Sequence, residues 1–374
     1  MVIAVNTRFL LKDYLEGYGN FTFECFSRLV KKYPQHTFLY IFDREFDKAF
    51  ITSDNITPVV AGPEARHPLL WQYWYNYKVP AILRKYKADV FVSPDGFCSL
   101  RTKVPQCLVL HDLAFIHYPQ FIHKSHLRFY KRFTPKFLQK AKSIATVSQF
   151  SKEDILRHYK VADDKIDVVY NGISNIFKPI GQEQKEAIKT KYAEGREFFL
   201  YTGSVHPRKN LMHLLKAFSI FKKRQKSNMQ LLIAGRLAWK YESFTTGLKN
   251  YKYRNEVKLL GYLPKEDLAA ITASAYAMVY PSYFEGFGVP PLEAMRCEVP
   301  VIASNVASIP EICGDAAIYI DPENIEDIAE KLMLLYKDEA LRSALIAKGK
   351  SQSNNFSWDK TTELLWHSII KATN

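Results

Sequence analysis

Short runs of β-branched and aromatic residues alternate with stretches of helical spacing along most of the chain. In the first half, the predicted strands are 2–6, 37–42, 56–60, 89–93, 105–110, 143–147 and 166–170. The stretch between the first two strands places five side chains on one helical face: Thr22, Cys25, Phe26, Leu29 and Val30. Because apolar strands that alternate with helices are typical of parallel sheets covered on both faces, we expect a doubly wound α/β domain here.

A polar segment of low β-propensity follows Asn171-Gly172 and interrupts this pattern, so we expect a linker over 176–196. The alternation then restarts, with strands predicted at 198–202, 229–234, 256–260, 276–280, 300–303 and 316–320. Three helical patterns close the chain, at 324–336, 339–349 and 357–371. The sequence therefore predicts two α/β domains, 1–175 and 197–354, and a C-terminal segment, 355–374.

The composition agrees with two folded domains. The 374 residues are 47% hydrophobic and 14% aromatic, which supplies enough apolar surface to offset the entropy of ordering the chain. Apolar stretches are all far shorter than the roughly 18 residues that a bilayer crossing needs. The N-terminus lacks the basic region and cleavage site of a signal peptide, so 2–6 is interpreted as a first strand. Five cysteines without a Cys-x-x-Cys pair favour buried thiols over disulfides or a zinc site.

The chain is basic, with 52 Lys and Arg against 38 Asp and Glu and a formal charge of +14. This charge leaves three classes of partner open: nucleic acid, an anionic membrane surface, or a substrate that carries phosphate. Ligands of doubly wound sheets bind outside the carboxyl ends of the strands. The residues just after each predicted strand are therefore the candidates for a site.

The loop after strand 276–280 is rich in glycine and proline and leads into a helix expected to begin near Pro290 or Pro291. Glycines leave backbone N–H groups open to a ligand, and a helix N-terminus favours an anion. Glu285 lies in this loop and Glu293 near the end of the first helical turn, so both carboxylates can face one cavity. The combination predicts a site for a ligand with hydroxyl and phosphate groups, although each acid alone would be an ordinary loop or helix residue.

Two adjacent cations, Arg208 and Lys209, follow strand 198–202, and Asn210 is placed to cap the next helix. A guanidinium and an ammonium between a strand and a helix suit a diphosphate, the alternative being a solvated basic loop. His111 follows strand 105–110, where its imidazole can hydrogen-bond a substrate hydroxyl and Asp112 can orient it; a structural histidine is the alternative.

Several motifs are missing or incomplete. Gly17-Tyr18-Gly19 imitates the start of a dinucleotide-binding fingerprint, but Thr22 replaces its last glycine. The fingerprint also needs its first glycine directly after a strand, and strand 2–6 ends well before Gly17. The two remaining interpretations are a glycine loop near a ligand and a turn into a helix. The sequence has no Asp-x-Asp pair, no HExxH, no P-loop and no Gly-x-Ser-x-Gly elbow. These absences argue against a metal-held diphosphate, a zinc hydrolase, a P-loop enzyme and a serine hydrolase.

The frame that runs from Glu285 to Glu293 resembles the Glu-x7-Glu motif of the GT4 family of retaining glycosyltransferases, which have the GT-B fold. The resemblance extends over nearly the whole chain, through Tyr201 to Ser204, Arg208 to Leu211, Val147 to Ser151, Tyr170 to Ile173, His111-Asp112 and Ser357-Trp358. It implies two Rossmann-like domains, an acceptor-binding one over 1–175 and a donor-binding one over 197–354, that face a central cleft. It also implies that the helix of 355–374 crosses back to the N-terminal domain.

The resemblance further implies roles for single residues. The catalytic residues would be His111, Arg208, Lys209 and Glu285. Arg208 and Lys209 would bind the donor diphosphate and stabilise its developing charge, Glu293 would bind the ribose hydroxyls, and His111 would contact the transferred sugar. The remaining donor-binding residues would be Gly17, Gly19, Gly203, Gly261, Tyr262, Leu263, Glu285, Gly286, Phe287, Gly288 and Val289. Tyr18 stands where many relatives have adjacent glycines, which puts the role of that loop in doubt. Catalysis would need neither metal nor cofactor, with a GDP-linked sugar, first of all GDP-mannose, or a UDP-sugar as donor.

The segment 124–142 carries seven cations and no acid, with four aromatic residues interleaved at helical spacing: Phe129, Tyr130, Phe133 and Phe137. It can form a basic amphipathic helix that lies on anionic lipid, or an ordinary helix whose aromatic face packs on the sheet. The first interpretation predicts a cytoplasmic enzyme at the inner face of the membrane that acts on a glycan or a lipid-linked acceptor in polysaccharide synthesis. The alternatives are a non-catalytic sugar-nucleotide-binding protein, an epimerase of the same fold, or a nucleic-acid-binding protein, for which no module is recognisable.

Overall fold

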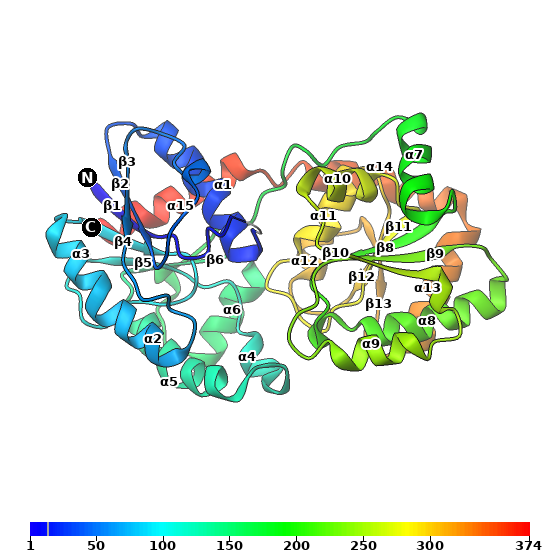
Figure 1. Cartoon of the computed structure of the whole chain (residues 1–374), viewed down its shortest axis with the longest axis horizontal. Coiled ribbons are helices and arrows are strands. Elements are labelled where there is room, and N and C mark those ends of the chain that lie inside the picture. The colour runs from blue at the N-terminus through cyan, green and yellow to red at the C-terminus, as the bar shows by residue number, and fades with distance from the viewer. Residues whose placement is uncertain (13–14) are drawn as a thin grey trace. The chain divides into compact units, whose positions relative to one another are not determined.

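The computed structural model describes residues 1–12 and 15–374 and divides the chain into two compact units. The first unit contains Met1–Gly172 and Trp358–Asn374, and the second contains Ile173–Ser357. Each unit is a parallel sheet with helices on both faces (Figure 1). The C-terminal helix therefore belongs to the first unit, although it follows the second unit in the sequence.

The first sheet has seven parallel strands in the order β3-β2-β1-β4-β5-β6-β7. The strands are β1 (Val2–Asn6), β2 (Thr37–Phe42), β3 (Ile56–Val60), β4 (Val90–Ser93), β5 (Gln106–Val109), β6 (Ser143–Thr146) and β7 (Ile166–Val168). Ile3 of β1 pairs with Phe38 on one side and Val90 on the other. The strand order changes direction between β1 and β4, so the loops after these two strands border the switch point, where ligands of such sheets bind.

Neighbouring residues of a strand point to opposite faces of the sheet, and here both sets are apolar. Helices therefore cover both faces of the first sheet. Ile3 and Val5 join a core with α1 and α15, whereas Ala4 joins a second core with α2, α3 and α5. The α1 face predicted from the sequence, which runs from Thr22 to Val30, is buried. The helices of this unit are α1 (Gly17–Lys32), α2 (Pro68–Tyr73), α3 (Val79–Lys85), α4 (Ala114–His117), α5 (Lys124–Lys140), α6 (Gln149–His158) and α15 (Trp358–Thr373), with short turns η1 (Lys48–Phe50), η2 (Trp74–Lys78), η3 (Pro119–Phe121) and η4 (Asp163–Lys165).

The second sheet has six parallel strands in the order β10-β9-β8-β11-β12-β13. The strands are β8 (Phe198–Thr202), β9 (Gln230–Ala234), β10 (Val257–Gly261), β11 (Ala277–Tyr280), β12 (Val301–Ser304) and β13 (Ala317–Ile320). The helices are α7 (Gln182–Ala193), α8 (Leu211–Gln225), α9 (Glu242–Lys249), α10 (Lys265–Ala273), α11 (Val289–Arg296), α12 (Ile309–Cys313), α13 (Ile325–Lys337) and α14 (Glu339–Ser353), with turns η5 (Pro207–Lys209) and η6 (Arg254–Glu256). Its switch point lies between β8 and β11.

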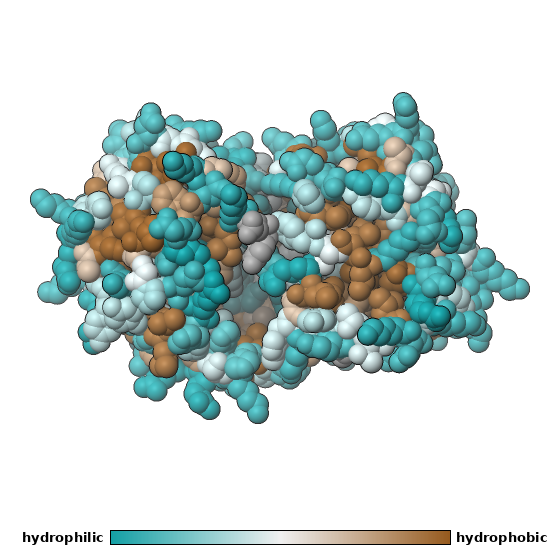
Figure 2. Space-filling view, viewed as in Figure 1, coloured by the Kyte–Doolittle hydropathy of each residue, from teal (hydrophilic) through white to brown (hydrophobic). Residues whose placement is uncertain are grey.

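Every predicted strand has a counterpart whose ends differ by at most two residues. The segment 176–196, expected to be a linker, is part of the second unit. It contains helix α7, and the Tyr192 hydroxyl donates to Asp267 of α10 over 3.1 Å. All five cysteines are buried, unbridged thiols. Among the described helices, none combines the length and the apolar composition that a membrane crossing demands. The face shown in Figure 2 is largely hydrophilic and is broken by separate apolar patches.

Candidate functional site

The two loops at the switch point of the second unit meet through charged side chains. Arg208 and Lys209 belong to η5, in the loop that follows β8, and Glu285 lies in the loop after β11. Lys209 Nζ lies 2.5 Å from Glu285 Oε1, and Arg208 Nη1 lies 3.2 Å from Glu285 Oε2. The structure thus brings together three residues that the sequence predicts for one site, although 76 residues separate Lys209 from Glu285.

Glu285 is 7% exposed, and its ionisation is decided by its two cationic neighbours. Burial alone would raise the pKa of the carboxyl, but the charges of Lys209 and Arg208 outweigh this effect and hold the pKa at about 2. Glu285 is therefore ionised at neutral pH. Two cations against one carboxylate leave an excess positive charge, and the side chains of Arg208 and Lys209 retain 22% and 11% exposure, so an anionic ligand can reach them.

Further hydrogen bonds fix the position of the two cations. The Lys209 ammonium donates to the Tyr280 hydroxyl over 3.1 Å and lies 5.3 Å from the centre of that ring. Arg208 Nη1 also donates to the carbonyl of Phe284, and the Arg208 carbonyl accepts from the Tyr283 N–H over 2.9 Å. Each cation is thereby tied to the opposite loop at more than one point, which preorganises their charge for a ligand.

Two buried side chains that the sequence interpretation missed or misplaced hold the loop carbonyls. The Ser308 hydroxyl, at the start of α12, lies 2.8 Å from the carbonyl oxygen of Glu285 and 2.9 Å from that of Phe287. Asn210 is the N-cap residue of α8, as expected, but its side chain makes no capping hydrogen bond: its backbone is left-handed, with φ 59°, and its amide donates to the carbonyls of Pro281 and Pro322. Only the folded sheet brings these carbonyls within reach, so sequence spacing gives no signal for either contact.

The second acid of the motif has a different environment. Helix α11 begins at Val289, with Pro290 and Pro291 in its first turn as expected, after Gly288 at φ 97°. The positive φ favours glycine at this position, and a Cβ on Gly288, 2.5 Å from Ile309 Cδ1, would also force that side chain to move. Glu293 of α11 is half-buried, and burial raises its pKa to about 7 despite the charge of Lys265. The described contacts do not join Glu293 to the Glu285 cluster.

Glycines line the carboxyl edge of three neighbouring strands in this unit. Gly203 follows β8, Gly235 follows β9, and Gly261 ends β10. Gly235 donates its N–H to the carbonyl of Gly261 over 2.7 Å, and a Cβ on Gly235 would lie 1.9 Å from the Gly203 oxygen. The edge is therefore bare backbone that a ligand can approach closely. Tyr262 and Leu263, predicted with Gly261 to bind the donor, follow β10, where Tyr262 is exposed.

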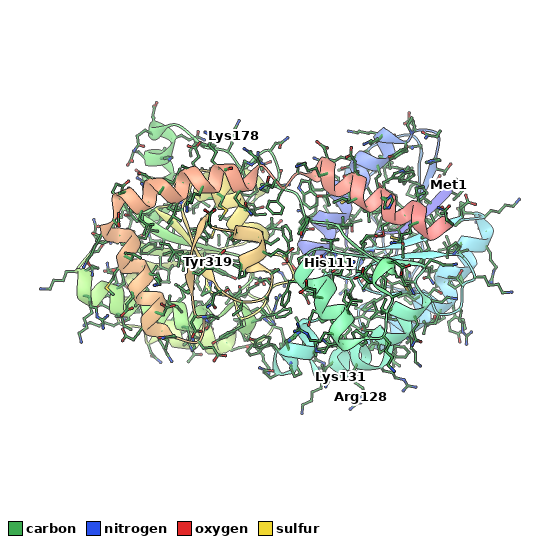
Figure 3. The ribbon with its side chains drawn as sticks, turned by 180° about the vertical axis from the view of Figure 1, so that it is seen from behind. Met1, His111, Arg128, Lys131, Lys178 and Tyr319 are labelled. Atoms are coloured by element: carbon green, nitrogen blue, oxygen red, sulfur yellow. The ribbon has the colours of Figure 1, made fainter. Side chains whose placement is uncertain are left out.

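In the first unit, His111 lies two residues after the end of β5, near the carboxyl edge of the sheet (Figure 3). Its Nε2 lies 2.9 Å from the carbonyl oxygen of Pro94, which can only accept, so Nε2 carries a proton. Burial lowers the pKa of His111 although the Pro94 carbonyl and the Asp112 charge oppose this effect, so the ring is neutral at neutral pH. Asp112 Oδ1 accepts from the Ala114 N–H at the start of α4 over 2.9 Å, and the Asp112 charge acts on His111, so the expected orienting role stays a prediction.

The glycine pair of the first unit lies in a helix and not in a loop. Gly17 and Gly19 occupy the first turn of α1, which decides between the two interpretations of this segment in favour of a turn into a helix. A Cβ on Gly19 would lie 2.4 Å from the Phe9 oxygen, whereas Gly17 has open space around it. The intervening Tyr18 packs edge-on against His111, with ring centres 4.8 Å apart.

A buried ion pair at the switch point of the first unit escaped the sequence interpretation. Arg8 follows β1 and Asp95 follows β4, and Arg8 Nε lies 2.7 Å from Asp95 Oδ2. The Tyr75 hydroxyl donates to the same carboxylate oxygen over 2.7 Å. Asp95 is adjacent to Pro94, so the ion pair fixes the loop whose carbonyl orients His111. A charged residue two positions after the end of each of two apolar strands is the signal that could have revealed it.

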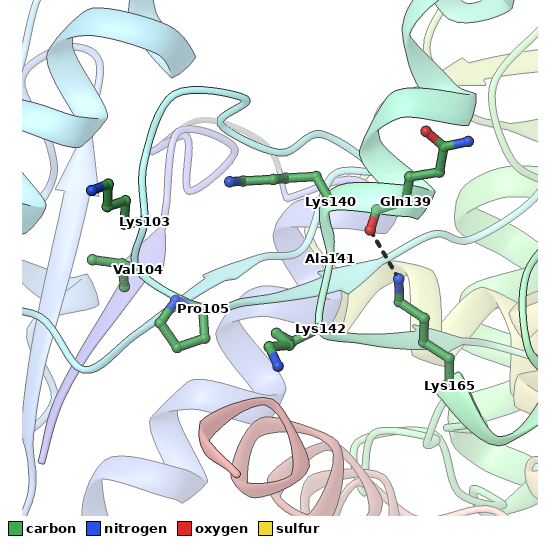
Figure 4. Close-up of a pocket in the computed structure, with 8 residues that line it drawn as sticks. All are labelled: Lys103, Val104, Pro105, Gln139, Lys140, Ala141, Lys142 and Lys165. Atoms are coloured by element: carbon green, nitrogen blue, oxygen red, sulfur yellow. Dashed lines mark hydrogen bonds between the residues drawn. The ribbon is translucent and has the colours of Figure 1, made fainter.

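The aromatic residues of α5 pack inward, as expected for an ordinary helix. Phe129 and Phe137 are buried in the first unit's core, and Tyr130 and Phe133 pack against it. Arg128 and Lys131 point outward (Figure 3). At the amino ends of β5 to β7, opposite the edge that His111 follows, a hollow of about 450 Å³ is lined by Lys103, Lys140, Lys142 and Lys165 (Figure 4).

Comparison with known proteins gives a consistent result for both units. The model of the family described as Glycosyltransferase Family 4 matches residues 17–175, and that of Glycosyl transferases group 1 matches residues 182–352. O-antigen chain mannosyltransferase B of Escherichia coli is 31% identical over 364 residues, which cover 94% of this chain and 95% of that protein. O-antigen chain mannosyltransferase RfbU of Salmonella typhimurium is 27% identical and covers 74% of this chain and 73% of its own length.

Solved structures agree on the fold. WaaG, a glycosyltransferase involved in lipopolysaccharide biosynthesis, has a TM-score of 0.80 at 17% identity, with 98% of this chain and 99% of that chain covered. HepE of Anabaena, in complex with UDP and glucose, has a TM-score of 0.77 at 16% identity and covers 99% of both chains. Since family models match both units and a relative of 31% identity extends over nearly the full length, the chain belongs to the family 4, group 1 glycosyltransferases, with the GT-B fold.

Proposed function

We propose that this glycosyltransferase moves mannose from GDP-mannose to a glycan or lipid-linked acceptor during the synthesis of an O-antigen-like surface polysaccharide. The observation that carries the proposal is the 31% identity, over 94% of the chain, with an O-antigen chain mannosyltransferase. A UDP-sugar is the second candidate donor, since HepE, of the same fold, binds UDP. Membership of a transferase family favours this function over an epimerase, a non-catalytic binding protein or a nucleic-acid-binding protein.

The cluster at the switch point of the second unit supports a role in donor activation. When a sugar leaves a nucleoside diphosphate, negative charge grows on the phosphate, and fixed cations lower the free energy of that transition state. In our proposal Arg208 and Lys209 bind the diphosphate, and Glu285 holds them in place and contacts the sugar together with the segment 286–289. Because the cations belong to the protein, the reaction needs no resident metal or cofactor.

The roles proposed for Glu293, His111 and the glycines rest on where each residue lies and how far it is buried. Glu293, half-buried at the edge of the sheet, is proposed to bind the ribose hydroxyls, and the bare backbone at Gly203 and Gly261 lets the nucleotide approach. In the first unit, the neutral His111 is proposed to contact the transferred sugar as a hydrogen-bonding group. Gly17 and Gly19 lie in the first turn of α1, whose N-terminal end favours an anion.

The test of donor and reaction uses the full chain with radiolabelled GDP-mannose, UDP-glucose and UDP-galactose, each with and without a membrane extract that contains lipid-linked glycans. Transfer of label from GDP-mannose to the glycan fraction, with an α-linked product, is the expected result. Label released only as free mannose would indicate a hydrolase. Transfer from a UDP-sugar with none from GDP-mannose would replace the proposed donor while the family assignment remained.

We further propose that the chain works in the cytoplasm, at the inner face of the membrane, through the outward cations of α5. Because the aromatic face of α5 packs inward, such binding would be electrostatic and would fall steeply with salt. Sedimentation with phosphatidylglycerol vesicles should carry the protein down at 20 mM salt and release it at 500 mM salt. The double variant Arg128→Glu/Lys131→Glu should sediment less than the control Lys348→Glu. Equal sedimentation of both variants, or none by the native chain, would refute membrane binding.

A further inference from the structure

Three side chains with metal-binding atoms converge in the first unit, away from the residues assigned to transfer. His117 is the last residue of α4, and Asp154 and His158 lie one turn apart on α6. His117 Nε2 lies 2.9 Å and 2.8 Å from the two carboxylate oxygens of Asp154, and His158 Nδ1 lies 3.2 Å from Oδ1. One ligand atom of each residue lies within 4.8 Å of those of the other two.

The burial of Asp154 calls for a positive charge. Asp154 is 2% exposed, and within residues 1–12 and 15–374 its side-chain partners are two imidazoles, with no lysine or arginine in an ion pair. A buried carboxylate is costly unless a positive charge lies beside it. A divalent cation between the three groups would supply that charge and could bind a ring nitrogen of each imidazole directly.

The spacing of the three groups fits such a cation. Ligands about 2.0–2.2 Å from a tetrahedral zinc ion are separated from each other by roughly 3.3–3.6 Å. The nitrogen–oxygen distances of 2.8–3.2 Å in the cluster are shorter than this by a few tenths of an ångström. Two imidazoles and one carboxylate leave a coordination position for water, and both histidines are exposed, so a metal can enter from solvent.

We propose that His117, Asp154 and His158 bind one divalent transition metal ion of the zinc type, which ties α4 to α6. The site is separate from the donor cluster, and no step of sugar transfer passes through it. Its mechanical effect reaches His111, because Ser151 in the first turn of α6 donates to the His111 carbonyl over 3.2 Å and Asp112 caps α4. The metal therefore braces the segment 111–117 from both ends.

Metal binding must displace protons that now form hydrogen bonds. His158 Nδ1 also lies 2.9 Å from the backbone carbonyl of Asp154, and His117 Nε2 donates to the carboxylate. The competing explanation is a set of hydrogen bonds that satisfies Asp154 without an ion. The two explanations differ in one measurable respect: metal ions stabilise the folded chain only if the site binds them.

The test compares thermal unfolding of the full chain, stripped with EDTA and dialysed, in the presence of ZnCl2, CoCl2 or MgCl2. Micromolar zinc and cobalt should raise Tm by several degrees, while magnesium, which prefers oxygen ligands, should not. His117→Gln and His158→Gln each leave Asp154 with one imidazole partner, so both should fold, with a lower metal-free Tm, and should lose the zinc-dependent rise. His367→Gln, which changes an exposed histidine of α15, should keep it.

A second readout uses cobalt, whose visible absorption reports the coordination of the ion. The native chain and His367→Gln should develop intense bands typical of a low-coordinate cobalt site, and the two cluster variants should not. The absence of any zinc-dependent rise in the native chain would overturn the proposal. A rise of equal size in all four proteins would also overturn it, because it would indicate adventitious binding to surface histidines.

Discussion

Glu285 neutralises part of the charge of Arg208 and Lys209 and also fixes where that charge lies. The carboxylate spans the two cations, and the Ser308 hydroxyl donates to the backbone carbonyls of Glu285 and Phe287. Flexible lysine and arginine side chains lose rotamer entropy when they bind an anion. Here the ion pairs with Glu285 already restrict both side chains in the folded chain, so less entropy would be lost on binding. The arrangement suits a site that must stabilise charge in the transition state without reorganisation.

The first prediction concerns these cations. Arg208→Ala or Lys209→Ala should lower kcat for sugar transfer by about 10²- to 10³-fold, because each removes a fixed charge from the leaving diphosphate. Circular dichroism should be unchanged, since Glu285 keeps one cationic partner in either variant. Lys223→Ala, an exposed cation of α8, serves as the control and should retain full activity. Turnover within threefold of the native rate in both site variants would contradict the assignment.

The second prediction concerns Glu293 and pH. Its pKa in the folded chain is about 7, above the ordinary value of 4.5, so the fold disfavours the ionised form. The unfolded chain releases this proton first, and stability therefore falls as pH rises from about 4.5 to 7. Glu293→Gln removes this loss, so its Tm relative to the native chain should be higher at pH 8 than at pH 5. The control Glu330→Gln changes an exposed residue, and its Tm relative to the native chain should be the same at pH 8 and pH 5. The same result for Glu293→Gln would contradict a raised pKa.

At the level of secondary structure, the loops that follow β8 and β11 become a site because parallel strands place their carboxyl ends on one edge. Glycines lie at the N-terminal ends of both α1 and α11, for different reasons: Gly17 and Gly19 are in the first turn of α1, and Gly288 precedes α11. Gly288 combines a positive φ with a close side chain, whereas Gly17 and Gly19 are ordinary helical residues in backbone conformation. Gly17 and Gly19 differ only in the space around them: the Phe9 carbonyl lies close to Gly19, and no atom lies close to Gly17.

The third prediction uses that difference. Gly17→Ala should leave stability unchanged or raise it by up to about 1 kcal/mol, because alanine is the better helix former and nothing lies within 4 Å of the new Cβ. Gly19→Ala should destabilise the chain, because its Cβ would lie 2.4 Å from the Phe9 oxygen, a backbone atom. Urea unfolding measures both. A loss of transfer in a stable Gly17→Ala would show that α1 approaches the donor there.

At the level of the whole molecule, the sequence predicted what depends on local pattern and on the order of strands and loops. Apolar runs gave every strand, and the motif residues Arg208, Lys209 and Glu285 met as predicted because each follows a strand. The ion pair of Arg8 and Asp95 was missed, since it depends on β1 and β4 being neighbours, which no local pattern reveals. The roles predicted from the resemblance for His111 and Glu293 stay predictions.

Helix α15, at the end of the chain, packs in the core of the first unit and contributes to the stability of that unit. Helix α15 contributes Trp358, Leu365 and Ile369 to the core that Ile3 and Val5 share, and the Ser143 hydroxyl donates to the Ser368 carbonyl over 2.7 Å. A domain is stable by only about 5–15 kcal/mol, and each such side chain contributes about 1.5–3 kcal/mol by burial. The sixteen residues of α15 are therefore needed for the stability of the first unit.

The fourth prediction follows from this closure. Leu365→Ala should lower the free energy of unfolding of the first unit by about 2–5 kcal/mol, because it leaves a cavity at a fully buried position. Leu364→Ala, on the exposed face of the same turn, should change it by less than about 0.5 kcal/mol. Hydrogen exchange should show faster opening of β1 to β7 in Leu365→Ala while β8 to β13 keep their protection. Equal loss of protection in both sheets would mean that the two units unfold as one.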